Sequence, residues 1–132
     1  MMRDIGLLIL RVGIGVMFIL HGWPKLFGGT EKWEKIGAKM SLVGIDFAPV
    51  FWGLCASLAE VLGGLLIALG LLFKPSTLLL AFTMLIASIY HLSEGDGIMG
   101  SSHSIESLIL FIGLLFIGPG KYRLRITKSP LG

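Results

Sequence analysis

Four long runs of apolar residues limit what this chain can fold into more than any other feature. They cover about residues 5–22, 50–73, 76–92 and 104–118. A helix needs about 20 apolar residues to cross a bilayer, whereas strands of membrane barrels are shorter and alternate in polarity. The sequence therefore predicts an all-α membrane protein. We expect an antiparallel bundle of four transmembrane helices forming a single domain over residues 1–132.

The composition fits this prediction and excludes several other classes of protein. Charged residues make up 14% of the chain, against about 25% in soluble domains. The basic residues flank the apolar runs and form no stripe with aromatic residues, so nucleic acid is not an expected partner. Cys55 is the single cysteine, which excludes an internal disulfide and a CxxC redox pair. We expect the lipid bilayer as a partner, together with a protein partner or a second copy of the chain.

Residues 30–43 show the pattern of an amphipathic helix. Apolar residues recur at spacings of three and four, namely Trp33, Ile36, Met40 and Val43. The other faces carry the lysines Lys32, Lys35 and Lys39. A tryptophan and several lysines suit the headgroup region, so the sequence predicts an interfacial helix between the first and second spans. A disordered loop is the alternative.

Lysines and arginines between the apolar runs set the expected orientation, because cytoplasmic loops are enriched in them. One side of the predicted bundle would hold Arg3, Lys74, Lys121, Arg123, Arg125 and Lys128. The other side would hold Lys25, Lys32, Lys35 and Lys39, diluted by acidic residues. We therefore predict a multi-pass protein of the plasma (inner) membrane with both termini in the cytoplasm. Residues 74–76 are expected to link the second and third spans, and residues 93–102 are expected to form a loop.

Three charged residues lie inside the apolar runs: Arg11, Glu60 and, near the start of its run, Glu106. Arg11 and Glu60 lie deepest in theirs. A charge at the centre of a span costs about 2.5 to 3.5 kcal/mol on insertion scales, so both are expected to face the bundle interior as a buried polar core. They would either contact each other or be satisfied separately by backbone or solvent. Glu60 shares its helix face with small residues that let another helix approach closely: Gly53, Ala56, Ser57, Gly64 and Ala68. A matching stripe on the first run consists of Arg11, Gly15, Phe18, Gly22 and Lys25.

A second group of polar residues lies at the ends of the apolar runs, near one membrane boundary: His21, Lys25, His91, His103 and Glu106. The motifs His91-x-x-Glu94 and His103-x-x-Glu106 would each place two side chains on one helix face. The group would contact a quinone headgroup, relay protons, or lie solvated at the interface. Di-iron bundles use the reverse order, Glu-x-x-His, with further carboxylates, so we predict no metal site.

The order and spacing of these residues resemble the DoxX family of small bacterial four-helix membrane proteins, over nearly the whole chain. The first run contributes Arg11, Gly15, Phe18, His21-Gly22 and Lys25-Leu26. The second and fourth contribute Glu60, Gly63-Gly64, Gly70, Glu106 and the ending Gly118-Pro119-Gly120-Lys121-Tyr122. The family usually ends GPG-x-Y-S-L-D, but here Arg123, Leu124 and Arg125 follow Tyr122. The resemblance therefore assigns no residue of this chain to any role of the aspartate that ends the family's pattern.

The resemblance implies a membrane subunit of quinone-linked oxidoreductase or oxidative-stress complexes. It carries over Arg11, Glu60, His21, Lys25 and Glu106 as interior polar residues. A quinone is the one cofactor suggested. The chain shows no nucleophile with a positioned base, so we expect an oxidoreductase-associated subunit and not a stand-alone enzyme. Two other functions stay open: an oligomeric transporter or ion-permeation protein whose buried ionisable groups line a path, and a membrane scaffold or assembly factor with no chemistry of its own.

Overall fold

The structure is a computed structural model that describes residues 1–123, and all regular elements within that range are helical. Four longer helices form the body, namely α1 (Met2–Leu26), α3 (Pro49–Leu69), α4 (Phe73–Ser93) and α6 (Ser102–Ile117). The short elements are α2 (Thr30–Gly37), the 3-10 helix η1 (Ala38–Val43) and α5 (Gly97–Gly100). In length and composition, α1, α3 and α4 can each cross a membrane, and α6 is a shorter apolar helix. The prediction of an all-α membrane protein is therefore confirmed for three spans.

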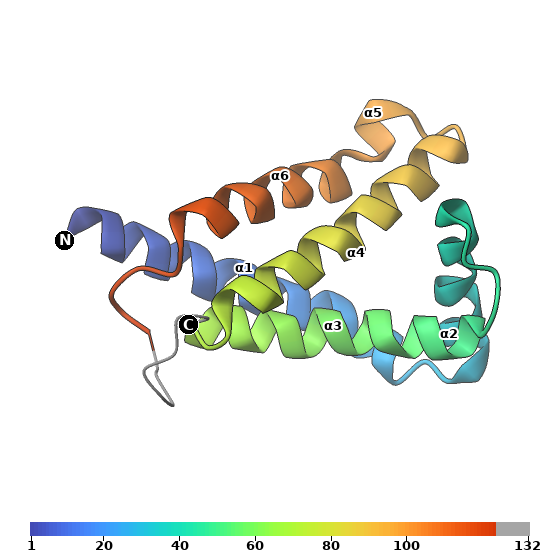
Figure 1. The fold of residues 1–132 in the computed structure, drawn as a ribbon, viewed down its shortest axis with the longest axis horizontal. Helices are drawn as coiled ribbons and strands as arrows, with labels where there is room; N and C mark the ends of the chain where they lie inside the picture. Colours follow the sequence, from blue (N-terminus) through green and yellow to red (C-terminus); the bar gives the residue numbers. More distant parts are fainter. Residues whose placement is uncertain (124–132) are drawn as a thin grey trace.

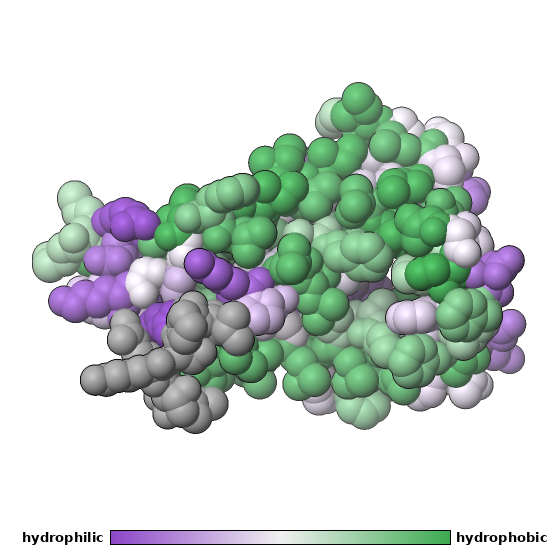
Figure 2. Space-filling view, viewed as in Figure 1, coloured by the Kyte–Doolittle hydropathy of each residue, from purple (hydrophilic) through white to green (hydrophobic). Residues whose placement is uncertain are grey.

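The surface of the molecule carries a broad apolar band between two polar ends, as Figure 2 shows. Large apolar side chains stand exposed on this band; Leu20 is 61% exposed, Ile109 65% and Phe116 84%. Exposed apolar patches of this extent are rare on soluble monomers. The surface is thus suited to lipid over its middle and to water at its ends.

Helices α1 and α3 approach each other closely because glycines face each other between them. A Cβ added to Gly64 would lie 2.6 Å from the carbonyl oxygen of Gly15, and one added to Gly22 would lie 2.7 Å from Cβ of Glu60. Four of the five residues in the predicted stripe on α1 are buried, namely Arg11, Gly15, Phe18 and Gly22, whereas the Lys25 side chain is 38% exposed. Packing through small residues is the usual way in which membrane helices associate.

Helices α3 and α4 join at a turn and diverge from it, as Figure 1 shows. Gly70 ends α3 in the left-handed region, with φ +76°, and α4 begins at Phe73. The link is therefore residues 70–72, and the prediction that residues 74–76 form it is wrong. Those residues lie in the first turn of α4, where a proline such as Pro75 removes no intrahelical hydrogen bond.

Residues 93–102, expected to form a loop, contain the short helix α5 before α6 begins at Ser102. The start of α6 is fixed by hydrogen bonds of Ser101, whose hydroxyl donates to the carbonyl oxygen of Gly97 at 2.7 Å. Helix α6 packs along α4, and the core between the helices is closed by Phe18, Ile67, Leu80 and Phe111.

Helix α2 and η1 cross the wide end of the molecule, beside α3 and near the far end of α4 (Figure 1). Gly37 and Gly53 allow the backbones of α2 and α3 to touch. The Trp33 indole N–H donates to the carbonyl oxygens of Lys25 and Leu26, at 3.0 and 3.2 Å. The predicted amphipathic helix is thus confirmed only over Thr30–Gly37, because the chain tightens into η1 after it.

The start of α1 and the segment that follows α6 are tied together at the other end of the molecule. Arg3 Nη2 donates to the carbonyl oxygen of Ile117 at 3.1 Å, and the Lys121 backbone N–H donates to Asp4 Oδ1 at 3.0 Å. The two polar segments therefore lie on one side. Arg125 and Lys128, which also entered the predicted orientation, lie outside the described residues.

The α1–α3 crossing predicts a large difference between two glycines on one helix. A Cβ at Gly15 would lie 2.8 Å from that of Ala68, whereas one at Gly13 meets nothing within 4 Å. We expect Gly15→Ala to lower the free energy of unfolding by about 1 to 3 kcal/mol, as overpacking does. The matched control Gly13→Ala should leave it unchanged or raised. Thermal unfolding in detergent measures both, and equal effects would contradict the crossing.

Candidate functional site

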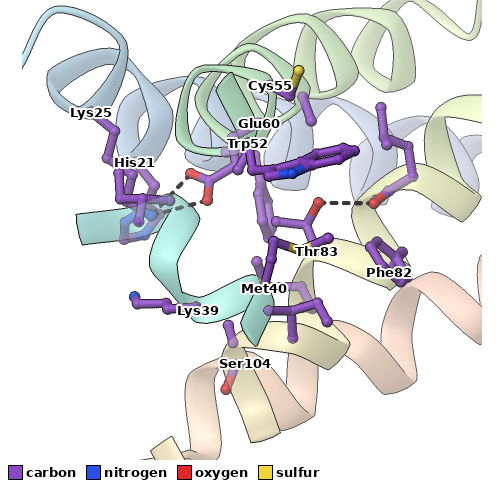
Figure 3. A pocket seen from close by; sticks show the side chains of 18 of the residues that line it. His21, Lys25, Lys39, Met40, Trp52, Cys55, Glu60, Phe82, Thr83 and Ser104 are labelled. Atoms are coloured by element: carbon purple, nitrogen blue, oxygen red, sulfur yellow. Dashed lines mark hydrogen bonds and ion pairs between the residues drawn. The ribbon is translucent and has the colours of Figure 1, made fainter. Parts of the chain in front are cut away.

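A cavity of about 280 Å³ lies where the helices diverge. Its walls come from α1, α3, α4 and α6, and η1 closes one side. Most of the lining is apolar, including Phe18, Ile36, Met40, Trp52, Phe82 and Met84. Figure 3 shows Met40 of η1 pointing toward side chains of α3 and α4, while Lys39, which also lines the pocket, extends away from them. We call this cavity the central pocket.

An ion pair between α1 and α3 supplies the main polar feature of the central pocket. Lys25 Nζ lies 2.9 Å from Glu60 Oε1 and 3.3 Å from Oε2, as the dashed lines in Figure 3 mark. The Glu60 side chain is only 5% exposed, whereas that of Lys25 is 38% exposed. A carboxylate this deeply buried is stabilised by a charged partner, and the close contact at Gly22 brings that partner within reach.

Four aromatic side chains join α1 to α6 at the edge of the central pocket. The ring centroids of His21 and His103 are 5.0 Å apart, and those of Phe18 and Phe111 are also 5.0 Å apart. Phe18 stacks on His103 at 6.2 Å. Both histidines line the pocket, so the structure brings together His21, Lys25 and His103 of the predicted site.

The two predicted His-x-x-Glu motifs take different positions. His91 lines the central pocket, but its Nδ1 pairs with Asp96 Oδ2 at 2.9 Å, and Glu94 caps α4. Glu106 is exposed on α6 and does not line the pocket. The roles predicted for His91 and Glu106, contact with a headgroup or relay of protons, stay predictions. His91 lies at the central pocket, and Glu106 lies outside it.

Arg11 and Glu60 are both buried, at 1% and 4% exposure, but they belong to different parts of the molecule. Glu60 pairs with Lys25, while Arg11 donates to the backbone carbonyl of Tyr122. Within residues 1–123, Arg11 Nε and Nη1 have no hydrogen-bond partner. The two charges therefore do not contact each other. Arg11 donates to backbone, as the second alternative had it, whereas Glu60 pairs with the side chain of Lys25, which neither alternative named.

Trp52 contributes an unusual donor to the central pocket. Its indole Nε1 is buried and has no hydrogen-bond acceptor among the described residues. Rings of Phe51 and Phe47 hold the indole edge-on, at 5.0 and 6.2 Å. A buried N–H without an acceptor costs about 1 to 3 kcal/mol, so this position favours a ligand that accepts a hydrogen bond.

Lys39 is the second amine at the central pocket. It is partly buried, and its Nζ lies 4.3 Å from the centroid of the Tyr90 ring. Burial lowers the pKa of Lys39, Lys25 nearby lowers it further, and Glu60 acts in the opposite direction. The amine therefore gains from any negative charge placed beside it.

The predicted site residues do not include four that line the central pocket: Trp52, Lys39, Cys55 and Thr83. Trp52 follows the start of an apolar run and is typical of an interfacial anchor. Lys39 fits a solvated face of an amphipathic helix. Only the position of η1 beside α3 and α4 brings Lys39 to the cavity that Trp52 lines, and no local pattern signals that position.

Comparisons with known proteins agree on one family. The family model described as DoxX matches residues 6–92. The chain is 32% identical to inner membrane protein YqjF of Escherichia coli (strain K12) over 127 residues, which cover 92% of this chain and 90% of the relative. It is 29% identical to inner membrane protein YphA of the same strain over 129 residues, covering 89% and 86%. No solved structure matches the chain.

The Lys25–Glu60 pair predicts strong coupling between two substitutions. Lys25→Met leaves the buried Glu60 carboxylate without its partner, and removal of one member of a buried pair costs about 3 to 5 kcal/mol at most. The partial exposure of Lys25 reduces that effect. We expect Lys25→Met to destabilise the protein more than Lys32→Met, and Lys25→Met/Glu60→Leu to recover part of the loss. A double-mutant cycle from thermal unfolding measures the coupling, and simple additivity would contradict the pair.

Proposed function

This chain is a small inner-membrane protein of the DoxX family, and we propose that its central pocket binds a quinone headgroup. In this proposal the protein is the membrane subunit of a quinone-linked oxidoreductase or oxidative-stress system. A partner protein in that system supplies the redox chemistry. The proposal rests on the donors in the pocket and on the apolar surface that surrounds them.

The membrane topology that we propose is one domain of four antiparallel spans, α1, α3, α4 and α6, with α2 and η1 at the membrane boundary. The hydrogen bonds from Arg3 to Ile117 and from Lys121 to Asp4 support it, because they hold the start of α1 and the end of α6 on one side. An even number of spans produces that arrangement. We place this side in the cytoplasm, in line with the basic residues that gather on it.

The unsatisfied indole N–H of Trp52 is the observation that carries the proposal. Around the same pocket lie the amines of Lys25 and Lys39 and the imidazoles of His21 and His103. This set is rich in donors and has one carboxylate, which already has a partner. A quinone ring is flat and presents two carbonyl oxygens as acceptors, so it suits both the donors and the aromatic walls.

The Lys25–Glu60 ion pair suggests that the chain also takes part in proton transfer. Reduction of a quinone to a quinol consumes two electrons and two protons. In our proposal the electrons come from the partner oxidoreductase, and Lys25, Glu60 and the two histidines hold or pass protons near the headgroup oxygens. Groups that can exchange protons beside a bound substrate are the usual requirement for such transfer.

Titration with a short-chain quinone tests the proposal, on protein purified in native lipid particles. Trp52→Phe keeps an aromatic ring and removes the N–H, so we expect about tenfold weaker binding, the effect of one hydrogen bond. The matched control is Trp23→Phe, because Trp23 is 54% exposed and does not line the pocket. Mass spectrometry of the bound small molecules and quenching of tryptophan fluorescence report the binding.

A second pair of variants checks the polar residues. Glu60→Gln should weaken quinone binding or alter its pH dependence, whereas Glu106→Gln should not, since Glu106 lies outside the pocket. Lipid alone in the purified protein, with no quinone binding, would overturn the proposal. In that outcome, liposome flux that depends on Glu60 would identify a transporter, and a stable protein partner without flux would identify a scaffold.

A further inference from the structure

A second groove lies between the α2–η1 segment and the end of α4. Its volume is about 550 Å³. Lys32, Lys35 and Lys39 line it at spacings of three and four, together with Tyr90 and Glu94 of α4. Lys32 and Lys35 share one face of α2, and Lys39 follows in η1. We call this cavity the basic groove, and only Lys39 and Ile36 line both it and the central pocket.

The basic groove has an excess of positive charge. Three lysines stand against one carboxylate, that of Glu94. Among residues 1–123 the ion pairs are Lys25–Glu60 and His91–Asp96, so none of the three groove lysines is in a salt bridge there. An anion bound in the groove would therefore meet more positive than negative charge.

The position of the basic groove decides which anion can reach it. Helix α4 is apolar enough to span a membrane and ends at Ser93, so Tyr90 and Glu94 mark its boundary with the headgroup region. Apolar side chains of Ile36 and Leu42 adjoin the lysines in the groove. Together they suit a molecule with a negative phosphate and a lipid chain beside it.

We propose that the basic groove binds the headgroup phosphate of an anionic phospholipid from the surrounding bilayer. Lys32 and Lys35 would donate to the phosphate oxygens, while Ile36 and Leu42 would contact the start of an acyl chain. Clusters of lysines at a membrane boundary attract anionic lipids in this way. The two residues that would hold the phosphate, Lys32 and Lys35, do not line the central pocket, so the lipid site can be tested separately from the quinone proposed there.

Native mass spectrometry of the full chain in a neutral detergent tests this site. Phosphatidylglycerol and phosphatidylcholine of equal chain length are titrated separately, and the bound fraction is measured. We expect phosphatidylglycerol to bind in preference. Lys32→Gln/Lys35→Gln should weaken its binding about thirtyfold, which is about fivefold for each lysine. Both side chains are exposed, so the variant should fold normally, and a thermal unfolding curve verifies this.

The matched control is Lys74→Gln/Lys121→Gln, which removes the same charge from exposed positions outside the groove. This variant should bind phosphatidylglycerol as the unmodified protein does. Equal binding of the two lipids, or equal losses in the two double variants, would overturn the proposal. Displacement of the lipid by glycerol phosphate alone, at equal concentration, would assign the groove to a soluble anion and would also overturn it.

Discussion

The close contact between α1 and α3 determines most of the arrangement described above. Gly15 and Gly64 let the two backbones meet, and Gly22 does the same beside Glu60. The carboxylate of Glu60 is therefore pressed against α1, where Lys25, three residues beyond Gly22, reaches it at 2.9 Å. Helix α4 leaves α3 at the far end, next to Gly70, and diverges from it. The central pocket is the space that this divergence opens on the side of the ion pair.

The membrane class and the buried face of α1 could both be predicted from the sequence, because they depend on local periodicity. The partner of Glu60 could not. The apolar run ends near Gly22, so Lys25 was expected at a boundary, whereas α1 continues through Pro24 to Leu26. Whether Arg11 or Lys25 meets Glu60 depends on how far α1 is shifted along α3. That shift is fixed by glycine contacts between two helices, which no single-helix pattern reveals.

The α2–η1 segment shows why an amphipathic pattern identifies a helix but not its surroundings. Its apolar face would suit the membrane surface, and the structure instead uses Ile36 and Met40 to close the central pocket. Both environments are apolar on one side and aqueous on the other, so the same sequence satisfies either. Trp33 decides between them, since its indole caps the last carbonyls of α1 and anchors the segment over the helices.

The unequal lengths of the helices have a consequence for the bilayer itself. Helix α1 has 25 residues and α6 has 16, so they rise about 37 and 24 Å along their axes. The hydrocarbon core is about 30 Å thick. If α6 spans the bilayer as proposed, lipid chains beside it would have to compress, and such mismatch carries an elastic energy that helix association relieves. In the proposed four-span arrangement, the α6 face is therefore the side on which the bilayer would favour contact with another short helix.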